Sequence, residues 1–98
     1  MFRNAPNIIC VCSPAKGGDL DPGLLGENIM LAAHAMGLGT CCLGGPVRFI
    51  NSNADAKFFL NRFDMPAGYR LNFIIAVGYP DESPDAKPRD ESKVRFIK

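Results

Sequence analysis

Residues 21–46, DPGLLGENIMLAAHAMGLGTCCLGGP, join a strongly apolar segment to a glycine-rich, uncharged turn. Asp21 is expected to cap a helix, because a carboxylate accepts hydrogen bonds from the unpaired N–H groups of a first turn, and Pro22 fits the first helical position. Gly37 and Gly39 supply the positive φ at which helices commonly end. The stretch therefore predicts a helix over residues 21–36, followed by a tight turn.

The apolar residues of this helix repeat at i, i+4, i+7 and i+11, which places them on one wide arc. They are Leu24, Leu25, Ile29, Leu31, Ala32, Ala35 and Met36. Asn28 lies within the arc and needs a hydrogen-bond partner if it is buried. His34, the only histidine, lies on the more exposed side and has no identifiable partner for base catalysis. The pattern predicts a helix buried in the core, with His34 as a surface residue.

Three further apolar segments predict the remaining elements. Residues 7–12, NIICVC, indicate a strand covered on both faces, and residues 71–79, LNFIIAVGY, indicate a central strand. Residues 51–63 predict a second helix capped near Asn51 or Asn53, with apolar residues at helical spacing. Between these elements lie loops rich in glycine and proline.

The composition is that of one globular domain. The chain has 98 residues, of which 47% are hydrophobic and 21% charged, with a net charge of +1. A charge this small provides no field to attract nucleic acid, and no apolar run reaches the roughly 20 residues that span a bilayer. The N-terminus lacks the features of a signal peptide, and neither cysteine pair has metal-site spacing. We expect reduced cysteines, a cytoplasmic location, and neither a nucleic-acid nor a membrane partner.

The last segment is proline-rich and charged. Residues 80–92, PDESPDAKPRDES, predict an extended, solvated tail, and residues 94–97, VRFI, predict a short strand after it. Such a strand cannot fold back as a simple hairpin, so it must pair with a distant sheet edge. That edge belongs either to the same chain or to another subunit.

Two local patterns indicate a ligand. At Gly44 and Gly45 no side chain prevents backbone N–H groups from approaching a ligand, although most such pairs are simple turns. Lys87 and Arg89 alternate in an extended segment that Pro88 stiffens, so both cations point to one side and could clamp a phosphate. The alternative is a solvated linker whose cations are balanced by neighbouring carboxylates.

Taken together, four motifs resemble the C-terminal half of the flavin-dependent nitroreductase family over nearly the whole chain. They are NAP at 4–6, ENIMLAAHAMGLGTC at 27–41, GYP at 78–80 and KPR at 87–89. The resemblance implies an α+β fold with a mixed, mainly antiparallel sheet and flanking helices. It also implies a homodimer with FMN at its interface, and hydride transfer from NAD(P)H to the flavin and on to nitroaromatic or quinone-like acceptors.

The resemblance also implies the site residues. Cys42, Leu43, Gly44 and Gly45 would lie against the isoalloxazine, with the N–H of Leu43 or Gly44 near the flavin N5. Lys87 and Arg89 would bind the FMN phosphate. Residues 80–98 would be the tail that family members exchange with the partner subunit, so residues 1–98 would form one partial nitroreductase-like domain.

The chain also departs from the family pattern. Family members are longer, and their N-terminal half carries an Arg-Ser-x-Arg phosphate motif and further flavin contacts that these 98 residues lack. Cys42 stands where many members have an aromatic residue. An isolated half-chain is therefore expected to be inactive or impaired. The alternatives are a non-catalytic, self-associating remnant and a small module that binds a phosphorylated ligand.

Overall fold

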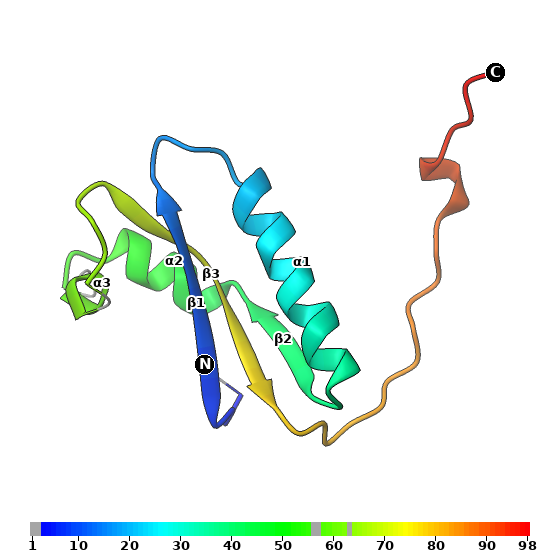
Figure 1. The fold of residues 1–98 in the computed structure, drawn as a ribbon, viewed down its shortest axis with the longest axis horizontal. Helices are drawn as coiled ribbons and strands as arrows, with labels where there is room; N and C mark the ends of the chain where they lie inside the picture. Colours follow the sequence, from blue (N-terminus) through cyan, green and yellow to red (C-terminus); the bar gives the residue numbers. More distant parts are fainter. Residues whose placement is uncertain (1–2, 56–57, 63) are drawn as a thin grey trace.

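The computed structural model describes residues 3–55, 58–62 and 64–98, which form a small α+β domain with a long C-terminal tail (Figure 1). In chain order its elements are β1 (Asn7–Pro14), α1 (Leu20–Ala35), β2 (Gly39–Leu43), α2 (Gly45–Ser52), α3 (Phe58–Arg62), β3 (Tyr69–Gly78) and the 3-10 turn η1 (Glu91–Lys93).

The sheet has the strand order β1-β3-β2, and both strand pairs are antiparallel. The strand predicted to be central is therefore central. Asn7 pairs with Val77 at one end of β1, and Pro14 pairs with Tyr69 at the other. The register between these strands shifts between Val11 and Cys12, as expected of a β-bulge.

Helices cover the two faces of the sheet. On one face the Gly26 backbone of α1 lies against Phe73 of β3. On the other face Ile50 of α2 packs in the core with Leu71 and Ile74 of β3. Because side chains alternate along a strand, β3 supplies apolar residues to both helices. This is why its sequence reads as a continuous apolar run.

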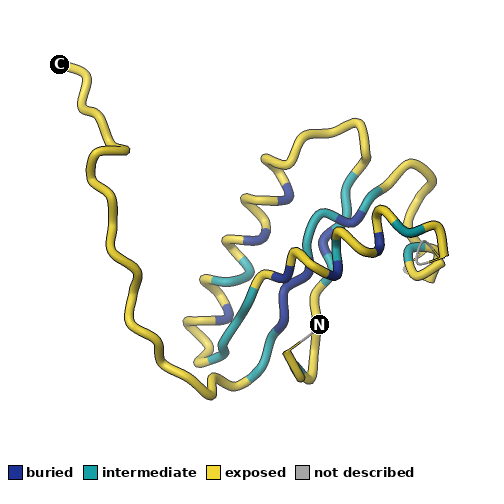
Figure 2. Tube along the Cα trace, turned by 180° about the vertical axis from the view of Figure 1, so that it is seen from behind, coloured by how far each residue is buried: buried dark blue, intermediate teal, exposed yellow. Residues whose placement is uncertain are grey.

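Burial is concentrated in β3 (Figure 2). The prediction that residues 7–12 form a strand covered on both faces is wrong, because β1 is an edge strand with exposed Ile8 and Ile9. The prediction of a buried α1 is also wrong: only Pro22, Gly26 and Ala33 are buried, and Leu24 and Leu31 remain 59% and 58% exposed. A three-stranded sheet is too narrow to cover so wide an apolar arc.

The start of α1 also differs from the prediction, whereas its end agrees. The helix begins at Leu20 with Asp19 as the N-cap residue, and Asp21 lies inside the first turn. Asp19 makes no side-chain cap hydrogen bond, because its carboxylate binds β3 instead. Gly37 has a φ of 79° and terminates the helix as predicted. Gly39 does not have a positive φ and begins β2.

The single helix predicted over residues 51–63 is replaced by the separate helices α2 and α3. Pro46 fits the first turn of α2, where no N–H is required. Asn53 ends α2, and its side-chain oxygen accepts a hydrogen bond from the Asp55 N–H at 2.9 Å. This local turn competes with helix continuation. Ala56 and Phe63, on which the predicted helical spacing also rested, lie outside the described residues.

The tail leaves the end of β3 and runs away from the sheet (Figures 1 and 2). It is extended as predicted, but residues 94–97 pair with no strand within the described chain. Val94, Phe96 and Ile97 are exposed, Ile97 completely. Pairing with an edge of the chain's own sheet is thus contradicted, and an edge on another subunit remains the open alternative.

Candidate functional site

The glycine turn lies where β2 ends and α2 begins. Leu43 is the last residue of β2 and its side chain is buried in the core. Gly44 is the N-cap residue of α2, and the Arg48 N–H donates the first helical hydrogen bond to the Gly44 carbonyl at 3.0 Å. The N–H groups before Arg48 have no partner within the helix, as at any helix start. The first turn carries no acidic residue, so these donors can serve an electron-rich acceptor.

Glycine at positions 44 and 45 is not required by φ or by packing within this chain. Neither residue has a positive φ, and a Cβ built on either would meet nothing within 4 Å. Backbone conformation and internal packing therefore both permit a side chain. Glycine is favoured at the N-cap position that Gly44 occupies, and at both positions it also permits close approach of a ligand to the backbone.

Cys42 lies beside this turn on the face that α1 covers. Its Sγ is 3.7 Å from the Sδ of Met30, although Cys42 itself is exposed. Burial of its thiol, with smaller contributions from Cys41 and Glu27, raises the pKa of Cys42 above its usual value. The thiol is therefore mostly protonated at neutral pH, which disfavours a role as a nucleophile.

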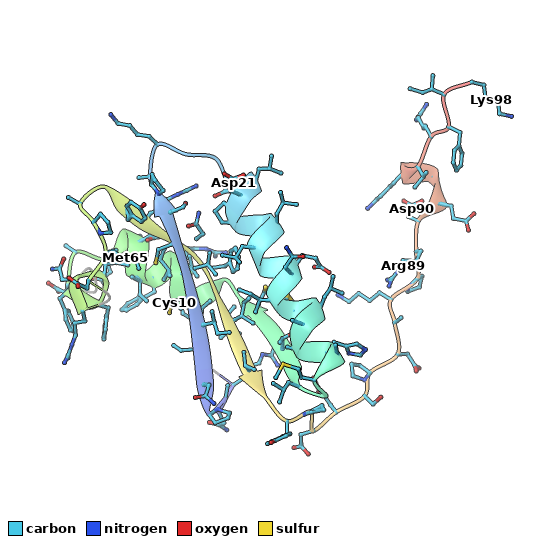
Figure 3. All side chains as sticks on the ribbon, viewed as in Figure 1. Cys10, Asp21, Met65, Arg89, Asp90 and Lys98 are labelled. Carbon is cyan, nitrogen blue, oxygen red and sulfur yellow. The ribbon has the colours of Figure 1, made fainter. Side chains whose placement is uncertain are left out.

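Lys87 and Arg89 belong to the extended tail, which runs away from the sheet and from the turn between β2 and α2 (Figure 1; Arg89 is labelled in Figure 3). Both are exposed, and Arg89 Nη1 donates a hydrogen bond to the Lys87 carbonyl oxygen at 3.0 Å. The structure thus brings Cys42, Leu43, Gly44 and Gly45 together. It does not bring the two cations to them within one chain.

A polar cluster that the sequence did not predict lies between the start of α1 and the first part of β3. Asp19 Oδ1 accepts hydrogen bonds from Arg70 Nη2 and, at 3.3 Å, from Asn72 Nδ2. Nearby, Asn51 Nδ2 donates to the Leu71 carbonyl oxygen at 2.7 Å. These partners are distant in sequence, so no local spacing could reveal them. The available signal was a pair of polar residues, Arg70 and Asn72, in a strand that is otherwise mainly apolar.

The part of the chain that the structure describes contains no group of three histidine, cysteine or acidic residues that could hold a metal ion. None of its helices combines the length and apolarity needed to cross a membrane. All four cysteines are free.

The fold places the chain in a known structural class. A nitroreductase with bound FMN from Bacteroides fragilis NCTC 9343 superimposes with a TM-score of 0.86 at 18% identity, over 99% of this chain and 54% of that one. An FMN-dependent nitroreductase from Clostridium difficile R20291 gives a TM-score of 0.73 at 31% identity, over 96% and 58%. The first likeness shows the fold alone, and together they define a nitroreductase-like α+β domain.

The sequence comparisons identify the family. The model of the nitroreductase family matches residues 1–79, so the chain belongs to that family. The NADPH-flavin oxidoreductase of Vibrio harveyi is 36% identical over 72 residues, which are 74% of this chain and 28% of that protein. The chain therefore spans only part of the relatives that it matches.

Proposed function

We propose that this chain forms part of an FMN-dependent oxidoreductase that takes hydride from NAD(P)H and reduces nitroaromatic or quinone-like acceptors. Family membership and the names of the matched relatives support this reaction class. One observation carries the proposal for this chain: Gly44 and Gly45 are exposed and have open space where side chains would stand. A flat heterocycle could rest against this backbone.

The residues of the turn suit the isoalloxazine. When bound, FMN would supply the hydride-accepting and electron-donating chemistry. The N–H of Leu43 or Gly44 would donate a hydrogen bond near the flavin N5, with Cys42 and Gly45 beside it. Backbone donors held at the start of a helix are already oriented, so they stabilise an electron-rich ring without further reorganisation.

Lys87 and Arg89 would bind the FMN phosphate. The tail runs away from the turn of its own chain (Figure 1), so we propose that these two cations reach the turn of a second subunit in a homodimer. The exposed apolar residues of the tail and of α1 support self-association, because patches of this kind mark interaction sites. The free thiols support a cytoplasmic location, since disulfides are rare there.

Flavin retention by the 98-residue chain tests the proposal. The chain is mixed with FMN and freed of excess by gel filtration, and its flavin absorbance is then measured. We expect Lys87→Ala and Arg89→Ala each to weaken FMN binding by about tenfold or more, since a hydrogen bond to a charged group contributes about 1.5–3 kcal/mol. Gly44→Val should also weaken it, by blocking the ring.

Two controls accompany this experiment. Lys93→Ala removes a tail cation outside the KPR motif, and Gly23→Ala fills another glycine with open surroundings. Neither should change flavin retention. A colourless oligomer that ignores FMN would overturn the proposal in favour of a non-catalytic remnant. Stabilisation by inorganic phosphate without flavin binding would favour the phosphate-binding module.

A further inference from the structure

A cavity of about 340 Å³ lies beside the first part of β3. β2 ends at Leu43, opposite Ile74, whereas β3 extends back to Tyr69 along β1. Residues 70–73 therefore have a strand on one side only. The start of α1 encloses the other side together with α2, which contributes Val47 from its first turn and Asn51 from its last. This volume falls within the range of about 300–1,000 Å³ that is usual for small-molecule sites.

The polar wall of the cavity presents two converging donors. Arg70 Nη2 and Asn72 Nδ2 both donate to one oxygen of Asp19. Two further atoms of these residues, Arg70 Nε and Asn72 Oδ1, are buried without a hydrogen-bond partner. Buried polar groups are almost always paired, so the cluster is not a fully satisfied structural ion pair.

The interaction of Asp19 with Arg70 and Asn72 is weak. The Asp19 side chain is 78% exposed and that of Arg70 is 37% exposed, and ion pairs this open to solvent are weak. Asp19 also engages only one terminal nitrogen of the guanidinium. A carboxylate on a free ligand could bind the guanidinium side-on through Nε and Nη2, after a small shift that opens the buried Nε. Bidentate pairs of this kind are stronger than single contacts.

The remaining wall is apolar. Pro22 of α1, Val47 of α2, and Leu71 and Phe73 of β3 line it. A ligand that fits both walls has a compact apolar or aromatic body and one carboxylate. We propose that this cavity binds small organic carboxylates of that class, and that Asp19 occupies the Arg70–Asn72 donor pair until the ligand replaces it.

The test uses phenylacetate, titrated into the isotope-labelled chain without flavin and followed by amide chemical shifts. The result is therefore independent of the proposed flavin function. Saturable shifts at residues 70–73 and at the start of α1 are expected. Asp19→Ala should tighten binding by about two- to fivefold, the range that corresponds to loss of an exposed ion pair. It removes no helix cap hydrogen bond, because Asp19 makes none.

Arg70→Met should abolish binding, and the neutral probe phenylacetamide should not bind. Lys93→Met, which removes a cation from the tail, should leave the affinity unchanged. If Arg70→Met does not fold, Arg70→Lys and Asn72→Ala replace it, and each should weaken binding at least severalfold. Absence of saturable shifts in both the wild type and Asp19→Ala would overturn the proposal and leave Asp19–Arg70 as a structural ion pair. Equal binding by the Arg70 variants would overturn it as well.

Discussion

Gly26 of α1 lies against Phe73 of β3 so closely that a Cβ on Gly26 would stand 2.5 Å from Phe73 Cζ. Non-bonded carbon atoms essentially never stand this close, so either the ring or the helix would have to shift. The contact sets how near α1 can approach the sheet, and it explains a glycine in the middle of a helix, where glycine is otherwise unfavourable.

Gly26→Ala should therefore destabilise the chain, because the ring or the helix must move. We expect a loss of about 1–3 kcal/mol in the free energy of unfolding, as for overpacked cores. Urea unfolding measures it. The matched control is Gly23→Ala, one turn earlier in the same helix, where a Cβ meets nothing within 4 Å. That substitution should stabilise by about 0.5–1 kcal/mol. Equal effects of the two substitutions would contradict the close contact.

Asn51 joins α2 to β3 through its hydrogen bond to the Leu71 carbonyl. Asn51→Ala leaves this carbonyl without its partner, so we expect a loss of about 1 kcal/mol in unfolding free energy. Ser52→Ala is the control, because the exposed Ser52 hydroxyl donates to the Arg48 carbonyl of its own helix and does not join α2 to the sheet. The control should stay within about 0.5 kcal/mol of the wild type. A larger loss at Ser52 than at Asn51 would refute the assigned role.

Phe96 and Ile97 are 86% and 100% exposed at the end of the tail. If the tail binds a second subunit, Phe96→Asp with Ile97→Asp should convert a dimer to a monomer in gel filtration with light scattering. Unfolding of the monomer should not change, because neither side chain packs in its core. Lys98→Ala should leave the dimer intact. A dimer that survives the double substitution would show that self-association uses another surface.

The thiols of Cys10 and Cys12 make stability depend on pH. Burial raises the pKa of Cys10, and burial together with the neighbouring Cys10 raises that of Cys12. The folded chain thus holds these protons more tightly than the unfolded chain, where a cysteine pKa is about 8.5. The stability contributed by the neutral thiols is complete below about pH 8.5 and is lost as the pH rises through the raised folded values.

The urea midpoint should accordingly fall as the pH rises above about 8.5. Cys10→Ala with Cys12→Ala should reduce the slope of this decline, whatever its effect on stability at pH 7. The comparison uses slopes, because loss of the half-buried sulfur atoms lowers stability at every pH. An unchanged slope would mean that other groups cause the decline.

The site could be predicted only in part. The resemblance indicated the turn at Gly44 and Gly45, and the structure places these two exposed residues at the start of α2. The separation of this turn from Lys87 could not be predicted. The sequence of a long extended tail does not indicate which surface the tail will contact. The role of these residues toward FMN stays a prediction.

The sequence alone determined those features that depend on neighbours along the chain. The apolar runs defined β3 and α1, Gly37 ended α1, and the prolines kept the tail extended. Tertiary structure decided which faces of the helices and strands are covered. Burial of a side chain depends on the elements that pack against it, and the apolar pattern of one segment does not identify them. Tertiary structure also decided that Asp19 binds Arg70 and Asn72 rather than capping its helix. The sheet brings the Arg70 guanidinium next to the Asp19 carboxylate. Asp19 is the N-cap residue of α1, and without this contact its carboxylate would be free to cap the helix.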